Sequence, residues 1–134
     1  MKVVVNRCYG GFGLSDKAIE MIMKRKGLNC FRYKMTKLEE YTRCDKLSAD
    51  DDLFVCYATK DLGEKISKFP SEFYWYEDNL NRDDVDLVAV VEELGEEANG
   101  RFAQLEVVEI PHDVFWEIDD YDGIETIHEV HRSW

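Results

Sequence analysis

The sequence contains no apolar run approaching the roughly 18 residues that a membrane-spanning helix needs, and its first residues lack the pattern of a secretory signal peptide. From these two absences we expect a cytoplasmic protein that does not bind membranes. The four cysteines (Cys8, Cys30, Cys44 and Cys56) form no CxxC pair. Widely spaced cysteines in a chain without a secretion signal are typical of reduced thiols rather than of a disulfide framework.

Positive charge is scarce, because 17 Lys/Arg face 29 Asp/Glu and leave a net charge of −12. Nucleic-acid binding depends on neutralising phosphates with Lys and Arg, so we expect no nucleic-acid partner. The charge is uneven: residues 1–46 hold 11 Lys/Arg and 5 Asp/Glu, whereas residues 47–134 hold 6 and 24. A basic first third can attract an anionic small molecule. The alternative is an acidic surface that serves only solubility.

Signatures of catalysis are also missing. The chain shows no Ser-His-Asp or Cys-His arrangement, and acidic residues are too abundant for any one carboxylate pair to indicate a reaction. The loop Cys8–Gly13 lacks the Gly-Lys-Ser/Thr ending of a P-loop and the glycine spacing of a dinucleotide-binding loop. A cysteine phosphatase would need an arginine where Leu14 stands. We therefore predict a protein without catalytic residues or a cofactor.

Histidine is rare, and only His128 and His131 lie close together in the sequence. On a helix these two side chains would share a face and could hold a metal ion with Glu125 or Glu129. On a strand they would point to opposite faces. Because this segment favours a strand, we predict no metal site.

The first 16 residues, by contrast, have a well-defined pattern. Val3–Val5 predict a short buried strand, and the glycines within Cys8–Gly13 allow positive φ angles. Ser15 or Asp16 can cap a helix over residues 17–26. Backbone N–H groups at such a loop and helix start point to one spot, which suits an anion such as phosphate. The alternative is a tight turn in which Cys8 is a small buried residue.

Later segments predict further helices and strands. A second amphipathic helix is predicted from near Asp83 to Leu94. Asp122–Gly123 predicts a hairpin turn, with a terminal helix as the alternative. Strands are also predicted over residues 28–33, 53–57, 73–76 and 105–110, and short helices within 35–52 and 61–69. Together these predict one domain over residues 1–134 with an α/β or α+β fold, a mixed sheet, an N-terminal strand–glycine loop–helix unit and a C-terminal hairpin.

Five segments stand out along the chain: CYGGFGLS (8–15), VVEELG (90–95) with ANG (98–100), VVEIP (107–111), YDG (121–123) and HRSW (131–134). Together they resemble a family of small uncharacterised proteins encoded largely by phages and prophages. The resemblance extends over most of the chain and implies no particular activity. It implies an accessory protein of the host-cell cytoplasm that acts on the host or its defences.

From the loop, the charge and this resemblance we predict a phage accessory protein that sequesters a small anionic nucleotide-derived signal of host defence, without catalysis. Phosphates would meet the loop amides, and the base would stack on Tyr9, Phe12 or Trp134. The predicted ligand-binding residues are Arg7, Tyr9, Gly10, Gly11, Phe12, Gly13, Ser15, His131, Arg132 and Trp134. Pockets of this kind often lie between subunits, so a homo-oligomer is expected.

Two other functions remain open at this point. An acidic protein-interaction inhibitor could bind the basic surface of a host enzyme that acts on nucleic acid. A small nucleotide hydrolase is the weaker alternative.

Overall fold

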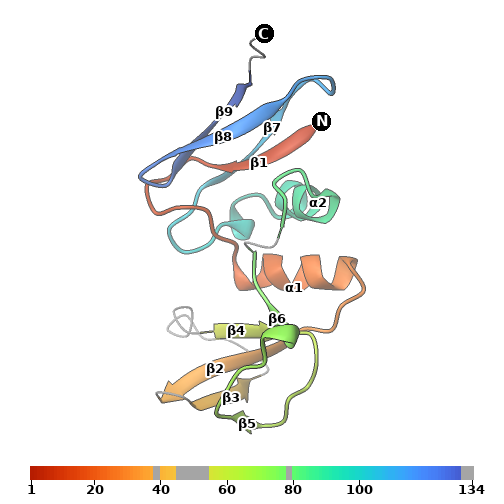
Figure 1. Cartoon of the computed structure of the whole chain (residues 1–134), viewed down its shortest axis with the longest axis vertical. Helices are drawn as coiled ribbons and strands as arrows, with labels where there is room; N and C mark the ends of the chain where they lie inside the picture. The colour runs from red at the N-terminus through yellow and green to blue at the C-terminus, as the bar shows by residue number, and fades with distance from the viewer. Residues whose placement is uncertain (38–39, 45–54, 78–79, 131–134) are drawn as a thin grey trace. The chain divides into compact units, whose positions relative to one another are not determined.

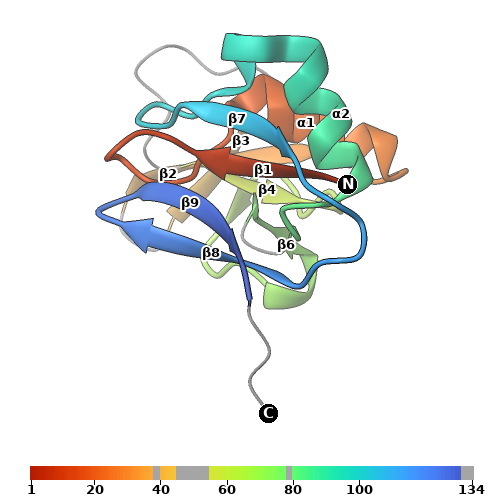
Figure 2. The ribbon, with the colours of Figure 1, turned by 90° about the horizontal axis from the view of Figure 1, so that it is seen from above.

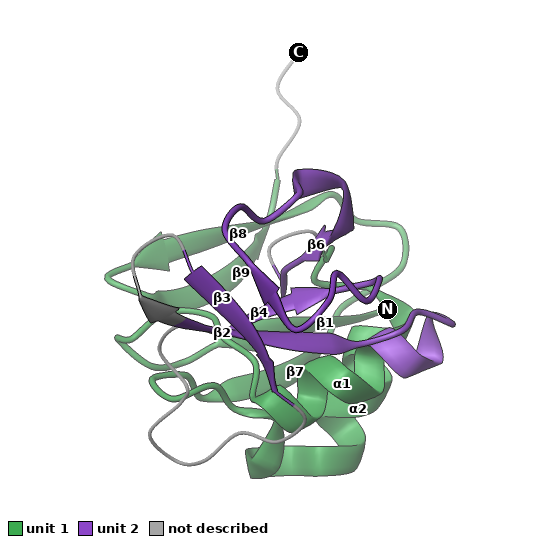
Figure 3. Cartoon of the chain, turned by 90° about the horizontal axis from the view of Figure 1, so that it is seen from below, with its two compact units in different colours: residues 1–22, 80–134 green, residues 23–79 purple. Residues whose placement is uncertain are grey.

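The computed structural model describes residues 1–37, 40–44, 55–77 and 80–130. Contacts between residues group the chain into two compact units, unit 1 (Met1–Ile22 and Leu80–Trp134) and unit 2 (Met23–Asn79), which Figure 3 colours separately. Helices and antiparallel sheets within these units confirm the α+β class. The single-domain boundary stays a prediction.

The predicted mixed sheet is not formed by the described strands. They pair only antiparallel and make three separate sheets. The two-residue turn at Asp122–Gly123 joins β8 directly to β9, which permits antiparallel pairing, whereas a parallel pair would need a long crossover connection.

The core of unit 1 is built on strand β1 (Lys2–Asn6), which pairs with β7 (Leu105–Glu109) over five residue pairs. Val3–Val5 are fully buried, which confirms the predicted strand. Helix α2 (Val85–Leu94) contacts both strands. The carboxylate of Asp84 accepts hydrogen bonds from two amides of its first turn, so the predicted start near residue 83 is confirmed. A short 3-10 helix, η4 (Gly95–Ala98), follows α2.

The C-terminal hairpin of unit 1 joins β8 (Trp116–Tyr121) to β9 (Ile124–Glu129), as predicted. Asp122 and Gly123 have φ angles of 51° and 93°, so both central residues of the turn adopt the positive φ of a type I′ turn. The alternative of a terminal helix over residues 124–129 is therefore wrong. Strand β9 contacts β1, and Figure 2 shows the two strands near each other.

Helix α1 (Asp16–Arg25) follows the glycine loop, and the boundary between the two units falls inside it. The hydroxyl of Ser15 accepts a hydrogen bond from the Ala18 amide at 3.2 Å, which identifies Ser15 as the cap. Gly27 ends the helix with a φ of 74°. One side of α1 is buried, as its apolar spacing predicted; these residues are Ala18, Ile19, Ile22 and Met23.

Unit 2 contains a five-stranded antiparallel sheet in the order β5–β3–β2–β4–β6, shown in Figure 1. Its strands are β2 (Phe31–Lys37), β3 (Glu40–Cys44), β4 (Val55–Ala58), β5 (Lys65–Ile66) and β6 (Tyr74–Trp75), with a 3-10 helix η2 (Ser71–Phe73) before β6. Tyr33 on β2 is fully buried. Its hydroxyl donates to the carbonyl of Gly63 and accepts from the amide of Leu62, both at 2.8 Å. The Phe69 ring lies edge-on to Tyr33 at 5.6 Å.

Three sequence predictions in unit 2 need correction. The strand predicted over residues 28–33 begins at Phe31, because residues 28–30 follow the end of α1 as irregular chain. The described part of residues 35–52 forms the β2–β3 hairpin instead of a short helix. Residues 61–69 contain β5 instead of a helix, because the carbonyl of Glu64 accepts from the Arg43 amide and draws this segment along β3. Residues 45–54 lie outside the described ranges.

Two further findings bear on the expectations from composition. All four cysteines are free thiols, as predicted. Among the described residues, no helix is long and apolar enough to cross a membrane.

Candidate functional site

Three loops of unit 1 meet at one place. They follow β1 (residues 7–13), precede β7 (99–104) and connect β8 to β9 (121–124), and Figures 1 and 2 both show them on the same side of the unit. A Cβ atom placed on Gly123 would lie 2.4 Å from the Tyr9 carbonyl oxygen, and one on Gly10 would lie 2.1 Å from the Cβ of Phe102. The backbones therefore approach each other more closely than a side chain allows. We call residues 8–13, 99–104 and 121–124 the three-loop surface.

The side chain of Asn6, the last residue of β1, forms hydrogen bonds to the backbone of these loops. It is fully buried, and its amide nitrogen donates to the carbonyls of Cys8 and Gly123, both at 2.6 Å. Its amide oxygen accepts from the backbone N–H of Gln104 at 2.9 Å and from that of Cys8 at 3.3 Å. One side chain thus forms hydrogen bonds to the backbone of all three loops. Buried polar groups satisfied in this way fix the local backbone.

A partly buried ion pair lies beside Asn6. Glu125 on β9 is only 4% exposed, and both its oxygens contact the guanidinium of Arg82, one of them at 2.8 Å. The same carboxylate accepts from the backbone N–H of Asn6 at 2.8 Å. The Arg82 guanidinium also lies 3.6 Å from the centre of the Phe12 ring. Phe12, predicted to stack on a base, therefore already has a cation over one face.

The charged and hydroxyl groups predicted to meet a phosphate are bonded to the chain itself. Arg7 donates to the Glu106 carboxylate at 3.0 Å and to the Glu125 carbonyl at 2.8 Å. Ser15 donates to the Glu97 carbonyl at 2.6 Å in addition to capping α1. The structure therefore brings the predicted loop residues together but gives several of them partners within the protein.

Part of the predicted amide cluster remains. In the described part of the chain, the backbone N–H groups of Gly10, Phe12 and Gly13 have no hydrogen-bond partner within the protein, while that of Gly11 donates to the Cys8 carbonyl at 3.3 Å. Gly11 has a φ of 92°, as expected for a glycine that the loop requires. Gly13 contributes its carbonyl, which accepts from the Gly100 amide at 2.9 Å.

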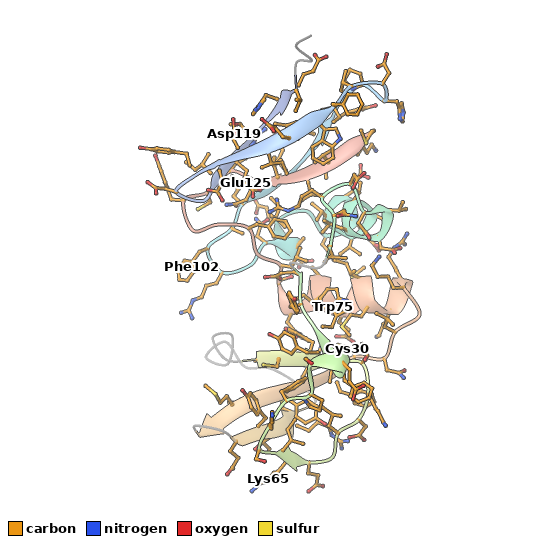
Figure 4. All side chains as sticks on the ribbon, viewed as in Figure 1. Cys30, Lys65, Trp75, Phe102, Asp119 and Glu125 are labelled. Carbon is orange, nitrogen blue, oxygen red and sulfur yellow. The ribbon has the colours of Figure 1, made fainter. Side chains whose placement is uncertain are left out.

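Each of the three loops presents one exposed aromatic side chain. Tyr9 is 69% exposed, Phe102 61% and Tyr121 74%. Phe102, labelled in Figure 4, lies on the loop before β7, and the guanidinium of Arg101 is 5.7 Å from its ring centre. Large apolar side chains gathered on a surface commonly mark a binding site. Sequence reasoning found Tyr9 but missed the other two, although Tyr121 lies next to the predicted Asp122–Gly123 turn.

The electrostatic setting differs from the predicted one. Unit 1 contains 6 Lys/Arg and 18 Asp/Glu and therefore has the whole net charge of −12, whereas unit 2 contains 11 of each. Most of the basic residues of the first third belong to unit 2. Within residues 1–22 the cations are Lys2, Arg7 and Lys17, and each pairs with a glutamate of unit 1. The glycine loop therefore belongs to an acidic unit, in which the basic residues of the first 22 positions are paired with glutamates.

A separate cavity of about 470 Å³ lies near the first residues of β1, away from the glycine loop that follows its last residue. Its apolar part comes from α2, and its polar part includes Lys2, whose ammonium lies 2.9 Å from Glu92. The hydrogen bond and charge of Glu92 raise the pKa of Lys2. The lining residues are Met1, Lys2, Asp83, Val85, Val88, Ala89, Glu92 and His112. None of the predicted ligand-binding residues lies there.

Three predicted site residues, His131, Arg132 and Trp134, lie outside the described residues. Comparison with protein-family models, with curated proteins and with solved structures gave no match. The resemblance to phage-encoded proteins therefore stays a prediction, and the site has to be interpreted from its own chemistry.

Proposed function

We propose that this chain is a non-catalytic recognition protein whose three-loop surface docks on a basic protein surface. The main observation behind the proposal is that each of three loops whose backbones approach closely carries one exposed aromatic side chain (Tyr9, Phe102 or Tyr121), in a unit with a net charge of −12. Aromatic side chains are frequent anchors of protein interfaces. Complementary charge accelerates association and selects the partner.

The rigidity of the loops supports this proposal. Asn6 bonds to the backbone of each loop or its immediate neighbour, and the close approach of Gly123 to Tyr9 leaves little room for movement. A surface that is ordered before binding loses less conformational entropy when it docks. The aromatic side chains are therefore presented on a backbone that does not need to rearrange.

The partner is defined by its chemistry. Proteins that act on nucleic acid carry Lys/Arg-rich surfaces that neutralise phosphates, and an acidic protein with aromatic anchors can cover such a surface. A host enzyme of this kind also fits the phage setting that the sequence resemblance implies. In this proposal the chain is an inhibitor of access to nucleic acid.

The test uses affinity capture of basic proteins from host extract, followed by calorimetry with the purified protein that is captured. We expect its dissociation constant to rise steeply between about 50 and 200 mM salt. Phe102→Ala should weaken binding about 30-fold, since truncation of an anchor costs about 2 kcal/mol or more. Tyr76→Ala is the matched control, because Tyr76 is an aromatic of unit 2 that is 41% exposed. Equal affinity of the two variants would contradict the proposal.

Sequestration of a nucleotide-like ligand is the second candidate. It is favoured by the amides of Gly10, Phe12 and Gly13, which have no partner among the described residues and lie in the same loop as the exposed Tyr9. Thermal unfolding with cyclic nucleotides and ADP-ribose derivatives tests it. A ligand at about 100 times its dissociation constant should add about 2.7 kcal/mol to stability. Stabilisation by one of these compounds that Tyr9→Ala removes would replace the docking proposal by this one.

A further inference from the structure

The β8–β9 hairpin places one histidine and two carboxylates on the same face. In its register Glu117 pairs with His128, and Asp119 pairs with Thr126. Since successive side chains of a strand alternate between faces, Glu117, Asp119 and His128 share one face, and the buried Glu125 occupies the other. Figure 4 labels Asp119 and Glu125 on the two strands of the hairpin.

The three side chains are already within reach of a common ion. His128 Nε2 lies 2.6 Å from Glu117 Oε1, and His128 Nδ1 lies 2.9 Å from Asp119 Oδ2. One ligand atom from each residue lies within 4.8 Å of the other two. An ion with bonds of about 2.0–2.2 Å keeps its ligand atoms no more than about 4.4 Å apart. The two carboxylates lie at different ring nitrogens of His128, so the side chains have to rotate to surround one ion. Their exposure permits this, because the side chains of His128, Glu117 and Asp119 are 42%, 56% and 67% exposed.

We propose that Glu117, Asp119 and His128 form a surface site for a divalent transition-metal ion of the Zn²⁺ type. Imidazole suits Zn²⁺, Ni²⁺ and Cu²⁺, whereas Mg²⁺ and Ca²⁺ prefer sites made only of oxygen atoms. Three protein ligands leave at least one coordination position for water or another ligand.

The site is distinct from the one considered on sequence grounds. That set combined His128 with His131 and with Glu125 or Glu129 on a helix, but in the structure Glu125 and His128 lie on opposite faces of a strand. The cluster of Glu117, Asp119 and His128 instead comes together because β8 pairs with β9. An ion bound there would join β8 to β9 through side chains as well as through the backbone. The strongly negative charge of unit 1 raises the local concentration of cations.

Titration calorimetry of the full chain with ZnCl₂, NiCl₂ and MgCl₂ in a non-chelating buffer tests the proposal. We expect one Zn²⁺ or Ni²⁺ per chain, and binding at least tenfold weaker in both His128→Ala and Asp119→Asn. Mg²⁺ should bind at least tenfold more weakly than Zn²⁺ to the unaltered chain. The imidazole nitrogen signals of His128 in NMR spectra should shift on addition of Zn²⁺.

Two matched controls locate the ion. His112→Ala removes a histidine that lies outside the cluster, and Glu129→Gln changes an exposed carboxylate on the opposite face of β9, so both should bind as the unaltered chain does. Circular dichroism without metal should show that every variant is folded. Binding that persists in His128→Ala would place the ion elsewhere, for example on the four thiols, and would overturn the proposal. Absence of binding at 1 mM ion by the unaltered chain would overturn it as well.

Discussion

Unit 1 and unit 2 bury their polar groups in different ways. In unit 1 the interior beside β1 contains a charged pair, Glu125 with Arg82, together with the amide side chain of Asn6. In unit 2 the fully buried Tyr33 bonds through one neutral hydroxyl to two backbone groups. Charged groups taken out of water depend much more on their partners than neutral ones do. Unit 1 should therefore be the more sensitive of the two to loss of a single polar atom.

The two units also differ on their surfaces. Unit 1 has a net charge of −12, whereas the positive and negative side chains of unit 2 balance to a net charge of zero. The exposed aromatics of the three-loop surface belong to the charged unit, as does the carboxylate–histidine cluster of the hairpin. Both proposals for recognition are therefore proposals about unit 1.

The largest effect is expected from Glu125→Ala in unit 1. It leaves the Arg82 guanidinium and the Asn6 amide without their carboxylate partner, and the free energy of unfolding should fall by about 3 kcal/mol. Urea denaturation followed by circular dichroism measures the loss. Glu129→Ala is the control on the same strand, because Glu129 is exposed and should change stability by less than about 0.5 kcal/mol. Equal losses in the two variants would show that the buried pair does not stabilise unit 1.

A smaller effect is expected where the hairpin turn meets the glycine loop. Gly123→Ala should lower stability by about 2–3 kcal/mol, since the new Cβ would lie 2.4 Å from the Tyr9 carbonyl oxygen. Gly11→Ala is matched to it, with almost the same φ but no atom within 4 Å of the new Cβ, and should cost only about 1 kcal/mol. Denaturation of both variants separates close packing from backbone strain. If Gly123→Ala were as stable as Gly11→Ala, the close contact between Gly123 and the Tyr9 carbonyl would be contradicted.

The smallest effect is expected in unit 2. Tyr33→Phe removes the hydroxyl bonded to Gly63 and Leu62, at a cost of about 1–2 kcal/mol. Tyr76→Phe removes a hydroxyl from a side chain that is 41% exposed and should be nearly neutral. Thermal and urea unfolding of both variants give the comparison. A loss for Tyr33→Phe as large as that for Glu125→Ala would remove the contrast between the two units.

Local patterns in the sequence predicted most of unit 1. The valines of β1, the Ser15 cap and the Asp122–Gly123 turn each depend on neighbouring residues alone, and each was found. The hairpin register follows from the turn, so the pairing of Glu117 with His128 was also available from the sequence once a two-residue turn was assumed.

The chemistry of the glycine loop was harder to predict. Arg7 looked available to an anion, but it pairs with Glu106, which lies 99 residues away in the sequence. Similarly, nothing near Phe12 indicates that Arg82 covers its ring. Such pairings depend on which distant segments the fold brings together, and local sequence patterns do not show that. The same reason explains why the three aromatics were not recognised as one surface.

The two units also differ in when their contacts become possible during synthesis. Every residue of unit 2 belongs to one continuous segment, residues 23–79, which is made before the second segment of unit 1, residues 80–134. Strand β1 is made first, yet its partner β7 follows about a hundred residues later, and Asn6 meets Glu125 across 119 residues. Contacts so distant in sequence form slowly. The apolar segment Val3–Val5 therefore stays without its partner strand until the last quarter of the chain emerges. During that interval it is exposed to aggregation or to binding by a chaperone.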